Sequence, residues 1–542
     1  MGFSDAVQEL LATLPVHVVL ELLRQEVCLL CIFRFLNVRD AVYSIDLPTS
    51  AEVYSKLLAS NEYREEDPKR LKSSEVDASI TGEPTCLICL GILQHLHPAV
   101  EAQSQAHEAR EAFDRNAVSC ILKAIKDGGH SLEGTFCLEV SLTALVLLRE
   151  RGLWCYLKEQ FKGEALFSGH DVNDHIVSLK EAVKWSLLER LENALPAKFD
   201  VGATLRIALV FKHQGSPEDV KFLAAASTGG DAKRKRHGQH EPESQGFAAV
   251  VAARGVTETG ETLAAVQRCL ASMNNELFMR RYQCPPTKVI SACEITAVIW
   301  RNPVFVGGRY LKYSRNVSQS RWLIEEERMG QASVQEIIGD VVMPYYKADT
   351  YKFHAAGRED IDVRMLGTGR PFIIELLNAR KIPSAEEMEK AQLDINGQKE
   401  GWVKVKGLRQ VGIEVCSLMR QGEVEKQKEY VAVVWLDRPV TQGDFQRLSD
   451  MKELEIQQKT PVRVLHRRSP LIRPRTIHWM RCESIKGSGN YFLLHLCTQA
   501  GTYIKEFVHG DLGRTYPNVG SLLDCAADIL QLDVVDVKME FE

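Results

Sequence analysis

The feature that most constrains this chain is a dense run of charge and glycine that leads directly into an apolar segment. Residues 354–372 hold three acids, three arginines and three glycines within nineteen positions. The apolar segment Ile373–Leu377 follows at once, and its composition predicts a short buried strand. Two interpretations are open: a site that presents a carboxylate beside guanidinium groups, or a surface loop with mutual ion pairs.

The same run contains motifs of a known family. Residues 357–360, which read G-R-E-D, resemble the G-R-x-D signature of pseudouridine synthases. The longer string through residues 362–367 and 369–372 resembles one family within them, the archaeal and eukaryotic Pus-ten family, which acts on the T-arm of tRNA. The resemblance implies that Asp360, the aspartate of G-R-x-D, is the catalytic carboxylate; Glu359 and Asp362 are the rival carboxylates in the motif. Arg358, close to Asp360 in sequence, is expected to help hold the displaced nucleotide or a phosphate.

A second string that resembles the family lies about fifty residues earlier. Residues 307–315 read G-G-R-Y-L-K-Y-S-R. Lys312 and Arg315 in this string are candidate phosphate contacts. The alternative is a loop that packs Tyr310 and Trp322 into a seam between domains.

Two later motifs complete the resemblance. Residues 428–435 have the β-branched and aromatic content of a strand, and Tyr430 matches the tyrosine that the family places beneath the target base. Residues 499–513 resemble the G-T-Y-I-[RK] motif, in which Lys505 stands at the basic position that pairs with the catalytic carboxylate. Leu522, or the leucine after it, matches an apolar residue placed against the base. Core packing and a solvated lysine are the alternatives.

A one-sign stretch lies between these two motifs. Residues 459–482 contain no acid, in a chain whose net charge is −5. Interleaved prolines keep this stretch from forming a simple charged helix. Because no acid balances its positive charge, we expect it to contact RNA phosphates. The alternative is a solvated basic face. The candidate RNA-binding residues are Arg463, Arg467, Arg468, Arg473 and Arg475.

The N-terminal part carries two C-x-x-C pairs, Cys28/Cys31 and Cys86/Cys89. This spacing lets both thiolates of a pair reach one ion, and two pairs supply a tetrahedral structural Zn²⁺ site. The alternative is four small core residues in apolar helices. The resemblance favours zinc, since Pus-ten members carry paired cysteines here. Such a site would be closed and would perform no chemistry.

At 542 residues the chain should hold several domains. We expect a helical, zinc-binding part over 1–96, a THUMP-like RNA-binding accessory domain over 97–290, and the catalytic domain over 291–542. The THUMP-like assignment comes from the resemblance. A loop near 228–246, with the basic run Lys233–Arg236, is expected to be disordered; it is either a nuclear import signal or a solvated insertion.

Hydrophobic periodicity gives a coarse set of elements within the first 290 residues. It predicts helices over 5–36, 117–125, 138–150 and 261–274. Alternating apolar residues predict a strand over 199–212.

The resemblance implies an α+β protein whose catalytic domain has a mixed, largely antiparallel sheet with the active cleft across its middle. The reaction breaks the N1–C1′ bond, turns the uracil and rejoins it through C5. It needs no redox or group-transfer cofactor, so Zn²⁺ is the one cofactor expected. The target uridine, at tRNA position 55 and with position 54 left open, would be flipped out between Tyr430 and Leu522. A cation near the buried carboxylate, Lys505, would keep Asp360 ionised.

No apolar run approaches the roughly 18 residues of a membrane span, and no signal peptide is visible. We therefore expect a monomer in the nucleus and cytoplasm that acts on tRNA, with other structured RNAs left open. The alternatives are a non-catalytic RNA-binding protein or tRNA chaperone, and a modification enzyme with a nucleotide or methyl donor. The latter is weakened because we find neither a P-loop nor a convincing G-x-G-x-x-G after a strand.

Overall fold

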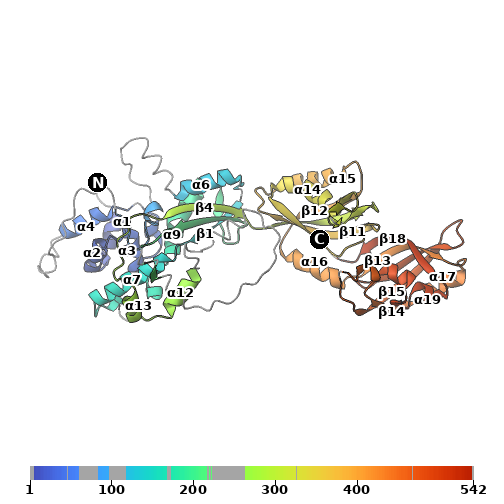
Figure 1. Ribbon diagram of the computed structural model, residues 1–542. Helices are drawn as coiled ribbons and strands as arrows, with labels where there is room; N and C mark the ends of the chain where they lie inside the picture. The colour runs from blue at the N-terminus through green and yellow to red at the C-terminus, as the bar shows by residue number, and fades with distance from the viewer. Residues whose placement is uncertain are drawn as a thin grey trace. The chain divides into compact units, whose positions relative to one another are not determined.

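The computed structural model describes residues 5–45, 47–59, 84–96, 117–132, 134–167, 172–216, 219, 221–222, 263–324, 326–466 and 468–539. The chain forms two compact units, Met1–Trp300 and Arg301–Glu542 (Figure 1). The expected loop near 228–246, with Lys233–Arg236, lies outside the described residues, and so does Arg467. Within the described part, no helix is both long and apolar enough to cross a membrane.

The first unit begins with short helices, as the periodicity over 5–36 predicts. These are α1 (Asp5–Thr13), α2 (Val16–Arg24) and α3 (Leu29–Phe35), and α4 (Ser50–Ala59) follows. The later helices are α6 (Ala117–Gly128), α7 (Leu145–Gln160), α8 (Val172–His175), α9 (Leu179–Ala194), α12 (Leu263–Ala271) and α13 (Asn275–Arg281). One hydrophobic cluster runs from Val7 to Cys293, so segments on both sides of residue 96 share a core.

A four-stranded sheet crosses the first unit in the order β2 (Ala197–Phe199), β1 (Gly134–Ser141), β3 (Leu205–Lys212), β4 (Glu294–Arg301). β1 pairs in parallel with both β2 and β3. The helix expected over 138–150 is therefore wrong in its first part, because Leu138 and Val140 are buried in β1 and the helix begins at Leu145. The strand expected over 199–212 is two strands, separated by a turn.

The second unit is built on a ten-stranded mixed sheet. Its order is β12 (Val403–Val411), β5 (Val304–Lys312), β11 (Arg364–Leu377), β18 (Ala527–Val537), β13 (Lys428–Leu436), β16 (Tyr491–Thr498), β15 (Ile472–Ser484), β14 (Lys452–Lys459) and β17 (Thr515–Tyr516), with β10 (Thr350–Ala355) paired to β11. β11 and β18 pair in parallel, while the pairs β5–β11 and β13–β18 beside them are antiparallel. The expected mixed sheet of the catalytic domain is confirmed.

The strand after the charged run is longer than the sequence predicts. Only Ile373–Leu377 is apolar enough to predict, but β11 begins at Arg364 and passes through a register shift between Met365 and Arg370. Gly367 has a φ of +61°, and a Cβ there would lie 1.7 Å from the carbonyl oxygen of Val535. The glycine therefore allows β11 to approach β18 closely while the strand bends.

Helices pack on this sheet and against each other. α14 (Val334–Tyr346) contacts α15 (Ala385–Asn396), and α15 lies against β12. A capping box starts α15, since the Ser384 side chain accepts from Glu387 N and the Glu387 side chain accepts from Ser384 N. In Figure 1, α14 and α15 lie above β12, and α16 (Glu414–Glu425) lies below β11.

Smaller elements complete the second unit. They are β6 (Val317–Ser318), β7 (Leu323–Ile324), β8 (Glu327–Arg328), β9 (Ala332–Ser333), α17 (Gln442–Ser449), the 3₁₀ turn η5 (Val462–Val464), α18 (Ile504–His509) and α19 (Val519–Leu523). The carboxylate loop, residues 356–363, connects β10 to β11 near the middle of the sheet.

Candidate active site and four-cysteine cluster

The carboxylate loop is held in place by a lysine behind it. Lys312, at the end of β5, donates to the carbonyl oxygens of Val317 (2.7 Å), Asp360 (3.1 Å) and Ile361 (2.9 Å). Its side chain is fully buried, and burial lowers its pKa from 10.5 to about 8 although nearby carboxylates oppose this. The expectation that Lys312 contacts RNA phosphate is therefore wrong, because its ammonium cannot reach solvent.

Arg315 also makes its contacts within the protein. Its Nη1 donates to the carbonyl oxygens of Asp362 (2.8 Å) and Leu532 (2.9 Å), and its Nη2 lies 2.7 Å from Oδ1 of Asp533. These bonds tie the carboxylate loop to β18. The string 307–315 thus supports the loop, and the phosphate role expected for Arg315 does not fit contacts that already fill its guanidinium.

Glu359 lies in a closed network. Both its carboxylate oxygens accept from the Tyr310 hydroxyl at 2.9 Å, and Oε2 lies 2.9 Å from Nε of Arg370. The side chains of Glu359 and Arg370 are each 1% exposed. Burial lowers the pKa of Arg370, but the charge of Glu359 outweighs burial and the net pKa is raised. Arg370 also donates to the Ala356 carbonyl at 2.7 Å, so this network fixes the start of the loop.

Gly357 is required by the same network. It has a φ of +91°, and a Cβ there would lie 2.8 Å from Nζ of Lys428 and 2.9 Å from Nη1 of Arg370. Only glycine adopts this conformation without strain and leaves room for both cations.

Asp360, the next residue after Glu359, lines an open pocket and is not part of this buried network. Its Oδ2 lies 3.0 Å from Nη1 of Arg463 and 3.7 Å from Nζ of Lys505. Its side chain is 36% exposed. The structure therefore brings Asp360 and Lys505 together, as the motifs predict, and adds a second cation from the basic stretch.

Lys505 is shared between two carboxylates. Its Nζ lies 2.7 and 2.9 Å from the two carboxylate oxygens of Asp362, closer than it lies to Asp360. Burial raises the pKa of Asp362, but the hydrogen bond and charge of Lys505 outweigh it, so the net pKa is lowered. Asp362 thus remains ionised and divides the positive charge of Lys505.

These groups face a pocket of about 240 Å³ that is open to solvent. Roughly 300–1,000 Å³ is usual for sites that take drug-sized ligands, so this volume suits a single flipped nucleoside. The pocket is lined by Gly357, Arg358, Glu359, Asp360, Val363, Arg370, Lys428, Tyr430, Arg463, Val464, Arg468, Gly501, Thr502, Tyr503, Ile504, Lys505, Leu532 and Val534. Charged side chains and apolar side chains thus share its walls.

Tyr430 and β18 supply the apolar wall. Tyr430 pairs with Val534 across β13 and β18, and burial raises the pKa of its hydroxyl to about 12. Leu522 does not line the pocket; it lies on α19 and packs against the core of the second unit. Leu532 of β18 lines the pocket, and the sequence does not single it out because its place beside β13 depends on strand pairing.

The fold places the arginines of the basic stretch in different surroundings. Arg463 reaches into the pocket, where it also pairs with Oε1 of Glu506 at 2.7 Å, and Arg468 lines the pocket with an exposed side chain. Burial lowers the pKa of Arg463, but hydrogen bonding and charge from Glu506 and then Asp360 raise it overall. Arg473 donates to Oγ1 of Thr460, and Arg475 has a pKa lowered by burial and then by Arg473.

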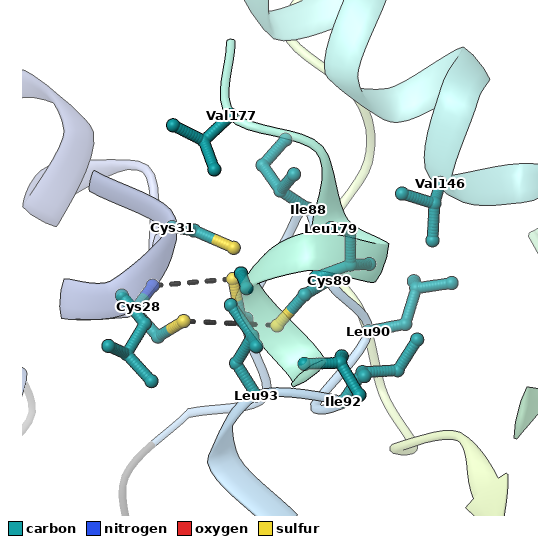
Figure 2. Close-up of a cluster of buried hydrophobic side chains, with 14 of the residues drawn as sticks. Cys28, Cys31, Ile88, Cys89, Leu90, Ile92, Leu93, Val146, Val177 and Leu179 are labelled. Carbon is teal, nitrogen blue, oxygen red and sulfur yellow. Dashed lines mark hydrogen bonds between the residues drawn. The ribbon is translucent and has the colours of Figure 1, made fainter. Parts of the chain in front are cut away.

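The first unit holds a second candidate site, the four-cysteine cluster. Cys28, Cys31, Cys86 and Cys89 are buried, and their sulfur atoms all lie within 4.8 Å of one another. Figure 2 shows apolar side chains around them, including Ile88, Leu93 and Val177. The structure thus brings together two pairs of thiols, 58 residues apart in the sequence, in a buried apolar setting.

The geometry of this cluster fits a tetrahedral metal ion. Sulfurs bound about 2.3 Å from a tetrahedral zinc lie about 3.8 Å apart. The sulfurs of Cys28 and Cys89 are 3.8 Å apart, and the Cys28 N–H donates to Sγ of Cys86. Arg34 donates to Sγ of Cys31, which supplies positive charge beside the thiolates. A structural ion here would tie α3 to the segment that carries Cys86 and Cys89.

Comparisons with known proteins agree with the motifs. The family described as "Pus10, C-terminal" matches residues 305–538, and "Eukaryotic Pus10, N-terminal" matches residues 86–299. The tRNA pseudouridine synthase Pus10 of Homo sapiens is 33% identical over 97% of both chains, and that of Xenopus laevis is 35% identical over 96% of both. That of Thermofilum pendens is 37% identical over 44% of this chain and 53% of its own.

Solved structures show only remote likeness. A Cbf5-Nop10-Gar1 complex gives a TM-score of 0.24 at 15% identity, covering 44% of this chain and 53% of that one. A pseudouridylate synthase gives 0.19 at 10% identity, covering 48% of this chain and 76% of that one. These scores add nothing to the family match. The two matching halves and the full-length relatives show that the chain belongs to the Pus10 family of tRNA pseudouridine synthases, as its motifs predict.

Proposed function

We propose that this isomerase converts uridine to pseudouridine in the T-arm of tRNA, at position 55 and with position 54 as a second target, and that Asp360 is the carboxylate that acts at C1′. The observation that carries the proposal is the placement of Asp360. It lies in an open pocket, beside Arg463 and Lys505 and opposite the apolar wall of Tyr430 and Leu532.

The reaction is an isomerisation in which the N1–C1′ bond breaks, the C5–C1′ bond forms, and the proton on C5 is lost as N1 gains one. Asp360 either attacks C1′ or withdraws a proton from the sugar, and both routes need an ionised carboxylate at the ribose. Two cations at Oδ2 stabilise that anion. Tyr430 and Leu532 would form the apolar wall against which the flipped uracil lies.

The test uses a tRNA transcript and the chain alone, without cofactor. Pseudouridines mapped by position should appear in the T-arm, and Asp360→Asn should abolish them while tRNA binding is retained. Modification confined to another arm would contradict the T-arm assignment. Normal turnover by Asp360→Asn would remove Asp360 from the reaction, and binding without any product would favour an RNA-binding protein.

We propose that the RNA body is held by two surfaces. The arginines of the basic stretch that line or flank the pocket, Arg468, Arg473 and Arg475, would bind phosphates near the target, and the first unit would act as the THUMP-like RNA-binding part. Removing a cation that binds a phosphate should make affinity fall less steeply with salt. Arg468→Gln should therefore weaken tRNA binding and flatten this dependence, whereas an unchanged salt dependence would contradict the assignment.

We propose that the four-cysteine cluster binds one structural Zn²⁺. The purified chain should contain about one equivalent of zinc, and Cys86→Ser should lose it and unfold at a lower temperature. Cys525→Ser, a change at a half-buried cysteine of the second unit, is the matched control and should keep the metal. A metal-free chain with full stability would contradict this proposal.

We also propose that the chain is a monomer found in nucleus and cytoplasm, and that structured RNAs other than tRNA are secondary substrates. Light scattering should give the mass of one chain, 60.9 kDa.

Imaging of the tagged chain, with Lys233–Arg236 intact or changed to glutamines, tests the import signal. A distribution that is the same for both would leave the basic run without that role.

A further inference from the structure

Arg463 lies in the pocket in a way that phosphate binding does not explain. Its guanidinium joins two carboxylates: Nη1 lies 3.0 Å from Oδ2 of Asp360, and Nε lies 2.7 Å from Oε1 of Glu506. It lies closer to Asp360 than Lys505 does. A planar guanidinium can span two carboxylates at fixed angles, which an ammonium cannot do.

Glu506 anchors this arginine. Its side chain is 2% exposed, and Oε2 has no hydrogen-bond partner within the described residues. A buried carboxylate is costly to leave without a cation, so Glu506 opposes any movement of Arg463 toward solvent or toward an RNA phosphate. The guanidinium also lies 5.9 Å over the ring of Tyr503.

Lys505 does not by itself fix the orientation of the Asp360 carboxylate. Asp362 holds the ammonium at 2.7 and 2.9 Å, whereas Asp360 lies 3.7 Å from it. The shortest contact that each cation makes with Asp360 is to Oδ2. We therefore assign Oδ1 as the oxygen that approaches the ribose.

We propose that Arg463, anchored by buried Glu506, is a positioning residue that holds Oδ2 of Asp360 and so turns Oδ1 toward C1′. The inference rests on the proposed function of Asp360. Glu506 and Lys505 are neighbours on α18, so one short helix places both the direct cation and the anchor of the second. Arg463 acts through Asp360 and does not itself touch the reacting atoms.

The test measures single-turnover rates at saturating T-arm stem-loop, with RNA affinity measured separately. Arg463→Gln and Glu506→Gln should each lower the rate about 10- to 100-fold, while affinity changes by less than about threefold. Arg463→Lys should recover part of the rate.

The double variant Arg463→Gln/Glu506→Gln should be no slower than the slower single variant, since both remove one interaction. Additive losses would mean that Glu506 acts independently, and they would overturn the anchoring step.

Controls separate this inference from a structural role and from the proposed function. Arg447→Gln breaks an exposed ion pair with Asp524 in the same unit and should keep the wild-type rate. Arg463 is 40% exposed, so Arg463→Gln should fold normally and decides the question if Glu506→Gln does not fold.

Weaker RNA binding with an unchanged saturated rate would overturn the inference. Asp360→Asn is measured in parallel. If it is inactive while Arg463→Gln behaves as wild type, only the present inference fails. If Asp360→Asn turns over normally, the proposed function fails as well.

Discussion

Glu359 and Asp360 are adjacent in the chain, yet they belong to two regions with opposite properties. The closed region joins Glu359 to Arg370 and Tyr310, with both carboxylate oxygens occupied and both charged side chains 1% exposed. The open region places Asp360 between Arg463 and Lys505, with its side chain 36% exposed to a pocket.

The difference separates two uses of the same chemical group. A carboxylate whose acceptors are all taken by protein donors holds structure, because breaking the network leaves a buried charge. A carboxylate in an open pocket, beside cations and an apolar wall, is the one that we propose acts on the substrate. The closed region also makes the open one possible, since Arg370 fixes the Ala356 carbonyl at the start of the loop that presents Asp360.

The largest effect on stability is expected in the closed region. Glu359→Gln should lower the free energy of unfolding by about 3–5 kcal/mol, because Arg370 is left as an uncompensated buried charge. Urea unfolding measures this, with Glu453→Gln, an exposed partner of His478, as a control that should change it by less than about 0.5 kcal/mol. Wild-type stability in Glu359→Gln would erase the distinction between the regions.

A pH effect comes next, from the lysine behind the loop. Because the pKa of Lys312 is lowered from 10.5 to about 8, between these values the unfolded chain holds a proton that the folded chain has released. The contribution of this group to the free energy of unfolding should therefore rise from pH 8 to pH 10.5, by up to about 3 kcal/mol. Comparing wild type with Lys312→Met across this range isolates it. A difference between the two that stays constant with pH would contradict the lowered pKa.

In the open region, Lys505→Met should change rate and leave stability nearly intact. We expect the single-turnover rate to fall about 10- to 100-fold, because Asp360 and Asp362 lose the cation that they share. Thermal unfolding should shift little, since exposed ion pairs contribute about 0–1 kcal/mol. If the variant unfolds at a much lower temperature, Lys505 stabilises the fold and its effect on rate cannot be assigned to Asp360.

The smallest effect is expected at the apolar wall. Tyr430→Phe should lower the rate less than about threefold, because the ring is kept and a hydroxyl with a pKa of about 12 stays neutral at physiological pH. Tyr430→Ala, which removes the ring, should lower it further. A large loss in Tyr430→Phe would show that the hydroxyl takes part in proton transfer.

The sequence predicts the open region better than the closed one. Asp360, Tyr430 and Lys505 each stand in a motif where the reaction restricts the residue type, and the structure brings all three to one pocket. Arg463 and Leu532 were not assigned to the pocket wall, because their places depend on contacts between distant segments, such as Arg463 with Glu506.

Two errors have a common physical cause. Lys312 stands in a string that resembles the family and is a candidate phosphate contact, but three carbonyl acceptors hold its buried ammonium. Likewise, the apolar content of Ile373–Leu377 predicts a short strand, but β11 begins at Arg364, and Gly367 lets the strand bend and continue. In both cases tertiary partners outweigh the local preference.

The most direct measurement compares the two neighbouring carboxylates in one assay. Asp360→Asn and Glu359→Gln are each assayed for single-turnover pseudouridine formation on a T-arm stem-loop and for the free energy of unfolding. We expect Asp360→Asn to lose turnover by about 10³-fold or more, with stability within about 1 kcal/mol of wild type. The fraction of Glu359→Gln that remains folded should still turn over. Retained turnover in Asp360→Asn, with turnover abolished in folded Glu359→Gln, would contradict it.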